Sequence, residues 1–187
     1  MFWKLKNKIP WDEIGTELGK TVVSDADRWT EAIKKSVLGK TEKELTNFDG
    51  DRWRYELCQF KMFWVWHVAN SPKLTNQGAT KPLLDAYNKS AYAAMVQVGL
   101  IGSDNPEHIR SWEMESRKRF IVYKRAYENP PPQPMFYTAT LGWEFGRFLF
   151  PAEEPHPLLV MLVNKMGSAE FESLVKIVSS LDKSYGR

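Results

Sequence analysis

The most continuous apolar stretch of the chain covers residues 51–70, with the sequence DRWRYELCQFKMFWVWHVAN. If these residues form an α-helix, hydrophobic and aromatic side chains cover most of its circumference. A helix that is apolar nearly all round belongs in the interior of a protein. We therefore predict that residues 51–70 form a central helix around which the remaining elements pack.

A narrow polar stripe interrupts this apolar surface. At about 100° per residue, six positions fall within one arc of the helix. These positions are Arg52, Glu56, Gln59, Phe63, His67 and Asn70. Two interpretations stay open: the stripe faces solvent or other helices, or it lines a pocket in which burial perturbs Glu56 or His67. These two residues lie about 16 Å apart along the helix axis, so they cannot act on each other directly.

Capping residues and glycines divide the N-terminal part of the chain. Ser24 predicts the start of a helix that ends before Gly39. Thr41 and Glu44 have the spacing of a capping box, which predicts a short helix. Residues 1–10 precede these signals, and we expect them to form a tail that packs back onto the domain.

Two longer amphipathic patterns occupy the middle of the chain. Apolar residues recur at helical spacing over residues 80–98, and glycines follow them. Asn105 followed by Pro106 is typical of a helix start. This helix is expected to end near Glu128, before the proline-rich loop of residues 129–135.

The C-terminal part is also predicted to be helical. Residues 136–150 form an expected helix, and a second proline-rich loop follows at residues 151–156. Pro157 opens the next apolar pattern. Gly167 and Ser168 predict a turn, with Ser168 as the cap of a new helix. The two helices on either side of this turn would form an αα-hairpin.

These patterns together predict an all-α fold, an irregular bundle of about seven or eight helices in a single domain covering residues 1–187. A hydrophobic content of 43% and a charged content of 26% are typical of globular domains. No apolar run reaches the ~18 residues of a membrane span, and no secretory signal pattern is seen. The single cysteine, Cys58, excludes an intrachain disulfide. We expect a soluble, cytoplasmic protein.

Residue types used in catalysis and metal binding do not form a coherent motif. Cys58 and His67 fall on opposite faces of one helix, which argues against a nucleophile–base pair. Glu153 and His156 have the spacing of a carboxylate metal site, but neighbouring prolines prevent the continuous helix that this spacing needs. No phosphate-binding glycine loop occurs. We therefore expect no metal and no cofactor, and the sequence favours a protein without catalysis.

Gly142 and Gly146 lie one turn apart within the expected helix of residues 136–150. Side chains are missing at both positions, so this face of the helix is smooth. It is expected to pack closely against another helix, and close approach of a ligand is the alternative.

Five basic residues gather on one side of the expected helix that follows Asn105. They are Arg110, Arg117, Lys118, Lys124 and Arg125. Met114 and Ile121 add apolar surface to the same side. The face is interpreted as solvated, as a docking surface for an acidic protein or anionic lipid, or as a nucleic-acid surface. A net charge of only +3 argues against nucleic acid.

The sequence favours a module that binds another protein or itself, because the many aromatic residues are of the types enriched in interface cores. An alternative is a small-molecule-binding protein or enzyme with an aromatic pocket around residues 51–70. That pocket would be closed by the helix from Lys81 and the segment 142–146, with Glu56, Gln59 and His67 as polar contacts. A second alternative is peripheral association with anionic membrane or nucleic acid through the basic face of residues 110–125, with weak membrane contact from the N-terminus.

Overall fold

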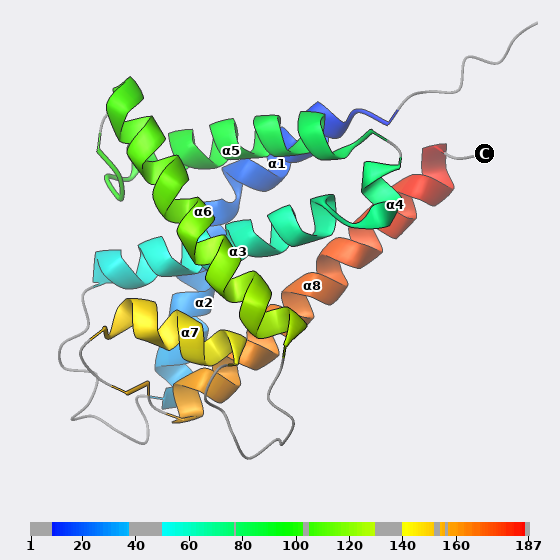
Figure 1. Ribbon diagram of the computed structural model, residues 1–187. Helices are drawn as coiled ribbons and strands as arrows, with labels where there is room; N and C mark the ends of the chain where they lie inside the picture. Colours follow the sequence, from blue (N-terminus) through cyan, green and yellow to red (C-terminus); the bar gives the residue numbers. More distant parts are fainter. Residues whose placement is uncertain are drawn as a thin grey trace, which may run out of the picture.

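Helix α3 (Gly50–Ala69) runs through the centre of the protein, as its apolar pattern predicts (Figure 1). The computed structural model describes residues 9–37, 50–76, 78–102, 105–129, 140–151, 154–155 and 157–185. Within these residues, α3 contacts six other helices, and its large side chains Trp53, Phe60 and Trp64 are almost fully buried. The core of the protein is therefore built around α3.

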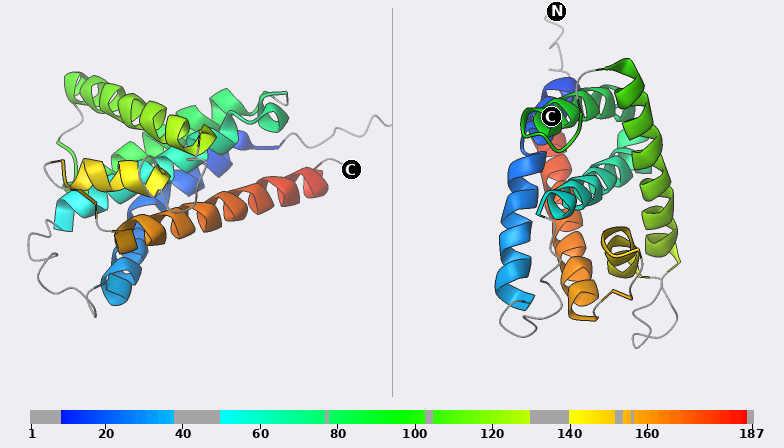
Figure 2. Two further views of the ribbon diagram at one scale, coloured as in Figure 1. Left: turned by 60° about the horizontal axis from the view of Figure 1, so that its bottom comes forward. Right: turned by 90° about the vertical axis from the view of Figure 1, so that its left-hand side faces the viewer.

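The described residues form eight helices and no strand, which confirms the prediction of an all-α single domain. In chain order the helices are α1 (Trp11–Lys20), α2 (Val22–Val37), α3, α4 (Pro72–Thr75), α5 (Thr80–Gln97), α6 (Pro106–Glu128), α7 (Leu141–Leu149) and α8 (Pro157–Tyr185). Figure 2 shows α3 enclosed between α2 on one side and α6 on the opposite side, and α8 crosses the bundle beside it. None of the described helices is long and apolar enough to cross a membrane.

Helix α1, which the sequence did not predict, packs closely against α5. A Cβ atom at Gly15 would overlap the carbonyl oxygen of Leu83, and one at Gly19 would lie 2.7 Å from the carbonyl oxygen of Tyr87. The hydroxyl of Ser90 adds a hydrogen bond to the α1 backbone. The two glycines therefore let the backbones of α1 and α5 meet without intervening side chains.

Helices α7 and α8 meet in a similar way. A Cβ atom at Gly142 would overlap the carbonyl oxygen of Val160, and the Gly142 N–H donates to Asn164 Oδ1 at 2.7 Å. Gly146 lies against the ring of Pro155. Both glycines of the G-x-x-x-G spacing thus face packed neighbours.

The predicted hairpin at Gly167 is wrong, because α8 continues through it as one helix. A Cβ atom at Gly167 would lie 3.0 Å from the ring of Trp64 and 3.1 Å from that of Phe60. The glycine therefore lets α8 pass directly over the aromatic core of α3. Ser168 does not cap a new helix, since its hydroxyl donates to the Asn164 carbonyl one turn earlier.

Of the two other predicted helix starts, the one at Asn105 is confirmed and the one at Ser24 is wrong. The Asn105 side chain accepts a hydrogen bond from the Glu107 N–H at 3.0 Å and starts α6 as predicted. Helix α2 begins before Ser24, whose hydroxyl donates to the Thr21 carbonyl. The predictions for residues 1–8, the capping box at Thr41, and residues 130–139 lie outside the described residues.

Candidate functional site

A cavity of about 430 Å³ opens at the C-terminal end of α3. Its volume lies within the range of small-molecule pockets, roughly 300–1,000 Å³. Residues of α3, α4, α6 and α8, and of the α3–α4 connection, line it. Its apolar lining consists of Trp66, Val68, Pro72, Phe171, Val175 and Val178. Its polar lining consists of His67, Asn70, Ser71, Lys73, Lys124, Glu128 and Ser179. The walls thus combine aromatic and aliphatic surface with a few polar groups.

His67 is half-buried in the cavity wall. Its ring stacks on Phe63 with ring centres 5.8 Å apart and meets the edge of Tyr127 at 4.8 Å. Burial lowers the pKa of His67, and Lys124 lowers it further, while Glu128 opposes this shift. The imidazole is therefore held neutral at pH 7, with one nitrogen to donate and one to accept a hydrogen bond.

The charged groups of the cavity carry more positive than negative charge. Lys124 Nζ lies 3.7 Å from a carboxylate oxygen of Glu128 and 6.0 Å from the ring centre of Trp66. Lys73 supplies a second cation from α4. The charged and titratable groups of the lining are therefore two lysines, one glutamate and the neutral His67.

The α3–α4 connection contributes hydrogen-bonding groups to the lining. Asn70 Nδ2 donates to the Trp66 carbonyl at 2.8 Å, which fixes the side chain at the end of α3. Ser71 occupies the cap position of α4, but its hydroxyl makes no capping hydrogen bond. Its oxygen can therefore face a ligand without breaking a helix cap.

The N-terminal half of the polar stripe faces other helices and not the cavity. Glu56 accepts two hydrogen bonds from Arg119, at 2.9 and 2.7 Å, and both residues are buried. The Arg119 guanidinium also lies 5.3 Å from the ring centre of Tyr55 and 5.0 Å from that of Phe148. Burial opposes the charged guanidinium, but the hydrogen bonds and charge of Glu56 raise the pKa of Arg119. This pair joins α3 to α6.

The other stripe residues have separate environments. Phe63 is fully buried and packs against Tyr123 of α6. Gln59 is also fully buried, and neither atom of its amide has a hydrogen-bond partner among the described residues. Arg52 is exposed and donates to the Phe148 carbonyl at 2.9 Å. Only the last two stripe residues, His67 and Asn70, reach the cavity.

The sequence-based hypothesis that α5 and α7 close the pocket is wrong. Neither α5 nor α7 lines the cavity, because α5 packs against α1 and α7 packs against α8. The cavity depends instead on α4, α6 and α8.

Sequence reasoning also missed the role of Arg119. Its position on the same side of α6 as Phe120 and Tyr123, away from Ile121, was the signal that it is buried.

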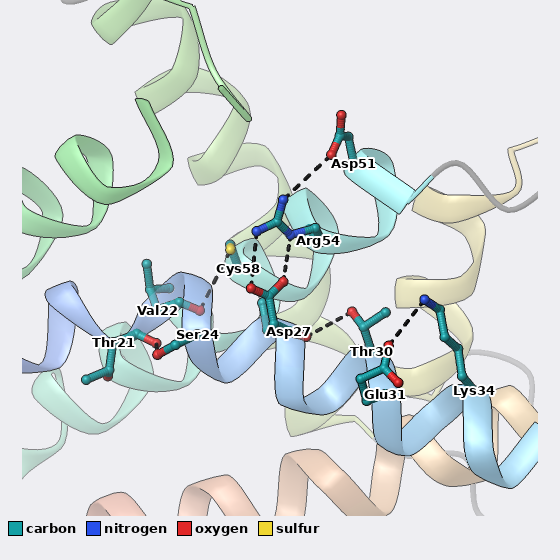
Figure 3. Close-up of polar contacts among 11 residues, drawn as sticks. Thr21, Val22, Ser24, Asp27, Thr30, Glu31, Lys34, Asp51, Arg54 and Cys58 are labelled. Carbon is teal, nitrogen blue, oxygen red and sulfur yellow. Dashed lines mark hydrogen bonds and ion pairs between the residues drawn. The ribbon is translucent and has the colours of Figure 1, made fainter. Parts of the chain in front are cut away.

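Cys58 does not line the cavity and is buried where α3 meets α2 (Figure 3). Its thiol donates to the Val22 carbonyl at 3.8 Å. Burial raises the pKa of Cys58 to about 12, so the thiol stays protonated at neutral pH. Beside it, Arg54 donates to both carboxylate oxygens of Asp27, at 2.6 and 3.1 Å, and ties α3 to α2.

Lys61 is a second buried ion-pair site, on the side of α3 that faces α2 and α8. Its ammonium pairs with Asp25 and lies 3.5 Å from Glu170. Burial lowers the pKa of Lys61, and Glu170 opposes this shift. These contacts hold three helices together away from the cavity.

The described part of the chain contains histidine, cysteine, aspartate and glutamate side chains, the residue types that bind metal ions. No group of three or more histidine, cysteine, aspartate or glutamate side chains there could hold a metal ion. Glu153 and His156 lie outside the described residues.

The five basic residues of the expected face are all exposed along α6. They are Arg110, Arg117, Lys118, Lys124 and Arg125. Lys124 also lines the cavity, so the basic face and the cavity meet at this residue.

Fold and cavity together define an all-α bundle with a half-open, aromatic-walled cavity. Comparisons of the chain with protein-family models, curated proteins and solved structures found no significant match. Function is therefore inferred from the cavity and the surface.

Proposed function

We propose that the protein binds a small, flat, largely apolar molecule with a negative charge in the cavity at the C-terminal end of α3. The observation that carries this proposal is the ligand-sized concave space, about 430 Å³, between aromatic walls and a few polar groups. Pockets of this size and composition are the usual sites of small-molecule binding in proteins.

The shape preference comes from the aromatic side chains of the lining. Trp66 of α3 and Phe171 of α8 both line the cavity, with Val175 completing the apolar surface. Aromatic rings favour offset or edge-on contact with another ring, which contributes about 0.5–1.5 kcal/mol beyond the area buried. A planar ring system therefore gains more here than a branched aliphatic molecule of equal size.

The charge preference comes from the lysines. An anionic group near Lys124 would lie beside the Trp66 ring and would compete with Glu128 for the ammonium. Lys73 of α4 also lines the cavity and carries positive charge. Neutral His67 can donate one hydrogen bond to the same group.

The sequence favoured a protein-binding module, and that stays a prediction. We place small-molecule binding first because the cavity is concave and its volume fits a small molecule. A standard protein interface is a larger surface that buries about 800 Å² on each partner.

Fluorescence titration with 1-anilinonaphthalene-8-sulfonate, an aromatic anion, tests the proposal. We expect saturable binding at one site per chain. Val175→Trp should abolish this binding, because the indole fills the cavity. Val98→Trp is the matched control, since Val98 is exposed directly after the end of α5 and does not line the cavity, and it should bind like the unaltered protein. Absence of saturable binding, or unchanged binding by Val175→Trp, would overturn the proposal.

The charge preference is tested with a second probe. Lys124→Met keeps most of the apolar stem and removes the ammonium. We expect it to weaken binding of the anionic probe about fivefold, which corresponds to about 1 kcal/mol. Binding of N-phenyl-1-naphthylamine, the uncharged counterpart, should stay unchanged. An equal loss for both probes would contradict a role for Lys124 in charge recognition.

A further inference from the structure

Helix α6 presents a ridge that points away from the core, and Figure 2 shows this helix at the edge of the bundle. The core side of the helix carries buried Trp112, Phe120 and Tyr123. The outer side carries Met114 and Ile121, which are 61% and 68% exposed. Residues seven apart lie on one line along a helix, so the two apolar side chains share the crest of the ridge.

Basic side chains flank this crest on both sides. At about 100° per residue, five of them lie within about 60° of the direction of Ile121. They are Arg110, Arg117, Lys118, Lys124 and Arg125, and all are exposed. The acidic residues in the same arc are Glu107 and Glu128, at the two ends of the helix. Five cations against two anions leave the ridge with a net charge of +3.

We propose that the α6 ridge, defined by these basic residues with Met114 and Ile121, docks onto an anionic lipid membrane. The basic side chains contact lipid phosphates and carboxylates, and the two apolar side chains enter the headgroup region. Surface helices that bind membranes combine basic and apolar side chains in this way. The proposal rests on the exposed face of α6 and shares only Lys124 with the ligand cavity.

The size of the ridge favours a membrane over a protein partner. From Arg110 to Glu128 it is about 27 Å long, and with a helix width of about 10 Å its area is about 300 Å². A stable protein interface needs about 800 Å² on each partner. Attraction to an anionic membrane instead depends on the number of basic groups that reach a flat surface together. A convex ridge with five cations near its crest meets this requirement.

The apolar residues on the crest also favour a membrane over a nucleic acid as the partner. Affinity for nucleic acid comes mainly from phosphate contacts by basic residues. Met114 and Ile121 lie between the basic residues on the crest, where such contacts would form. A lipid headgroup region accepts both kinds of side chain.

The expected binding is weak and depends on salt. A net charge of three supports an enrichment of about a hundredfold on anionic over neutral vesicles at low ionic strength. Raising the salt concentration shortens the range of this attraction and should release the protein.

Vesicle sedimentation tests the proposal with the full chain. Vesicles of phosphatidylcholine alone are compared with vesicles that also contain phosphatidylserine. Arg117→Glu with Lys118→Glu reverses the charge of the ridge and leaves the cavity-lining Lys124 in place. Lys89→Glu with Lys165→Glu is the matched control, because both lysines are exposed on other helices and the change in net charge is the same. Met114→Ser with Ile121→Ser tests the apolar crest.

We expect the unaltered protein and the Lys89/Lys165 control to sediment with phosphatidylserine vesicles. The Arg117/Lys118 variant should bind at least about tenfold more weakly. The Met114/Ile121 variant should also bind more weakly, at an unchanged salt dependence. Circular dichroism checks that every variant is folded. Absence of binding, or an equal loss in the control, would overturn the proposal. Tighter binding to polyglutamate or to duplex DNA than to the vesicles would also overturn it and would indicate an acidic protein or a nucleic acid.

Discussion

The Glu56 carboxylate accepts two hydrogen bonds from the Arg119 guanidinium, at 2.9 and 2.7 Å, inside the contact between α3 and α6. Removing one member of a buried ion pair costs about 3–5 kcal/mol, because the other charge is left without its partner. We therefore expect Arg119→Met to lower the free energy of unfolding by that amount.

Urea denaturation measures this effect, and a double variant isolates the pair. Glu56→Met with Arg119→Met removes both charges and should recover most of the loss. Arg117→Met, at an exposed position two residues away, should change stability by less than about 0.5 kcal/mol. If Arg119→Met were as mild as Arg117→Met, the pair would not stabilise the contact between α3 and α6.

Replacement of Gln59 is expected to raise stability, in contrast to replacement of Arg119. Its amide is fully buried and has no partner among the described residues. A buried polar group without a hydrogen bond costs about 1–3 kcal/mol. Gln59→Met has a similar shape and should raise the free energy of unfolding by about this amount. Gln97→Met, at an exposed position on α5, is the control and should have little effect. A clear loss of stability in Gln59→Met would show that the amide is hydrogen-bonded in solution.

Gly15 gives a test of the contact between α1 and α5. Alanine is normally the better helix former, by about 1 kcal/mol. At Gly15, however, the added methyl group would overlap the Leu83 carbonyl oxygen. Because neither backbone can yield locally, Gly15→Ala should destabilise the protein by about 1–3 kcal/mol. Glu13→Ala, exposed on the same helix, should be nearly neutral. Stabilisation by Gly15→Ala in thermal denaturation would mean that the two backbones are further apart.

His67 should make stability depend on pH in a specific direction. Its pKa is lowered by burial in the folded protein. Between its ordinary value of about 6.5 and the lower folded value, the unfolded chain binds more protons than the folded chain. Stability contributed by neutral His67 is therefore complete above about pH 6.5 and decreases as the pH falls through this window.

Comparison of histidine variants separates this contribution from those of other groups. Unfolding free energies measured from about pH 7 to about pH 5 should fall less steeply in His67→Gln than in the unaltered protein. His108→Gln, at an exposed position on α6, should keep the original slope. Equal slopes in all three proteins would contradict burial of neutral His67.

Helices with a regular spacing of hydrophobic residues, or with a clear local cap, were predicted from the sequence. The central helix and α5 followed from the spacing of hydrophobic residues, and α6 followed from its cap at Asn105. The larger errors concern helices that contain glycine. Helix α8 was divided at Gly167, because glycine indicates a break when only local sequence is considered. Helix α1, which contains Gly15 and Gly19, was not predicted. In the structure, Gly15 and Gly167 sit inside helices since a neighbouring backbone or ring occupies the space of a side chain.

The candidate site was predicted only in part for a related reason. Rotation around α3 placed His67 and Asn70 on one arc, and both line the cavity. The same arc also contained Glu56, whose partner Arg119 lies 63 residues later in the chain. Packing between distant segments determines which helix contacts each residue of this arc. The sequence of α3 alone does not contain that information.

The passage of α8 over α3 has a consequence for synthesis of the protein. The rings of Phe60 and Trp64 meet the backbone of α8 at Gly167, about 100 residues later in the chain. At roughly 5–20 residues per second, this gap corresponds to roughly 5–20 s on the ribosome. During that time the central helix α3, whose side chains are mostly buried in the folded protein, lacks part of its cover and exposes aromatic surface. Synthesis of α8 is therefore the step that ends this exposure.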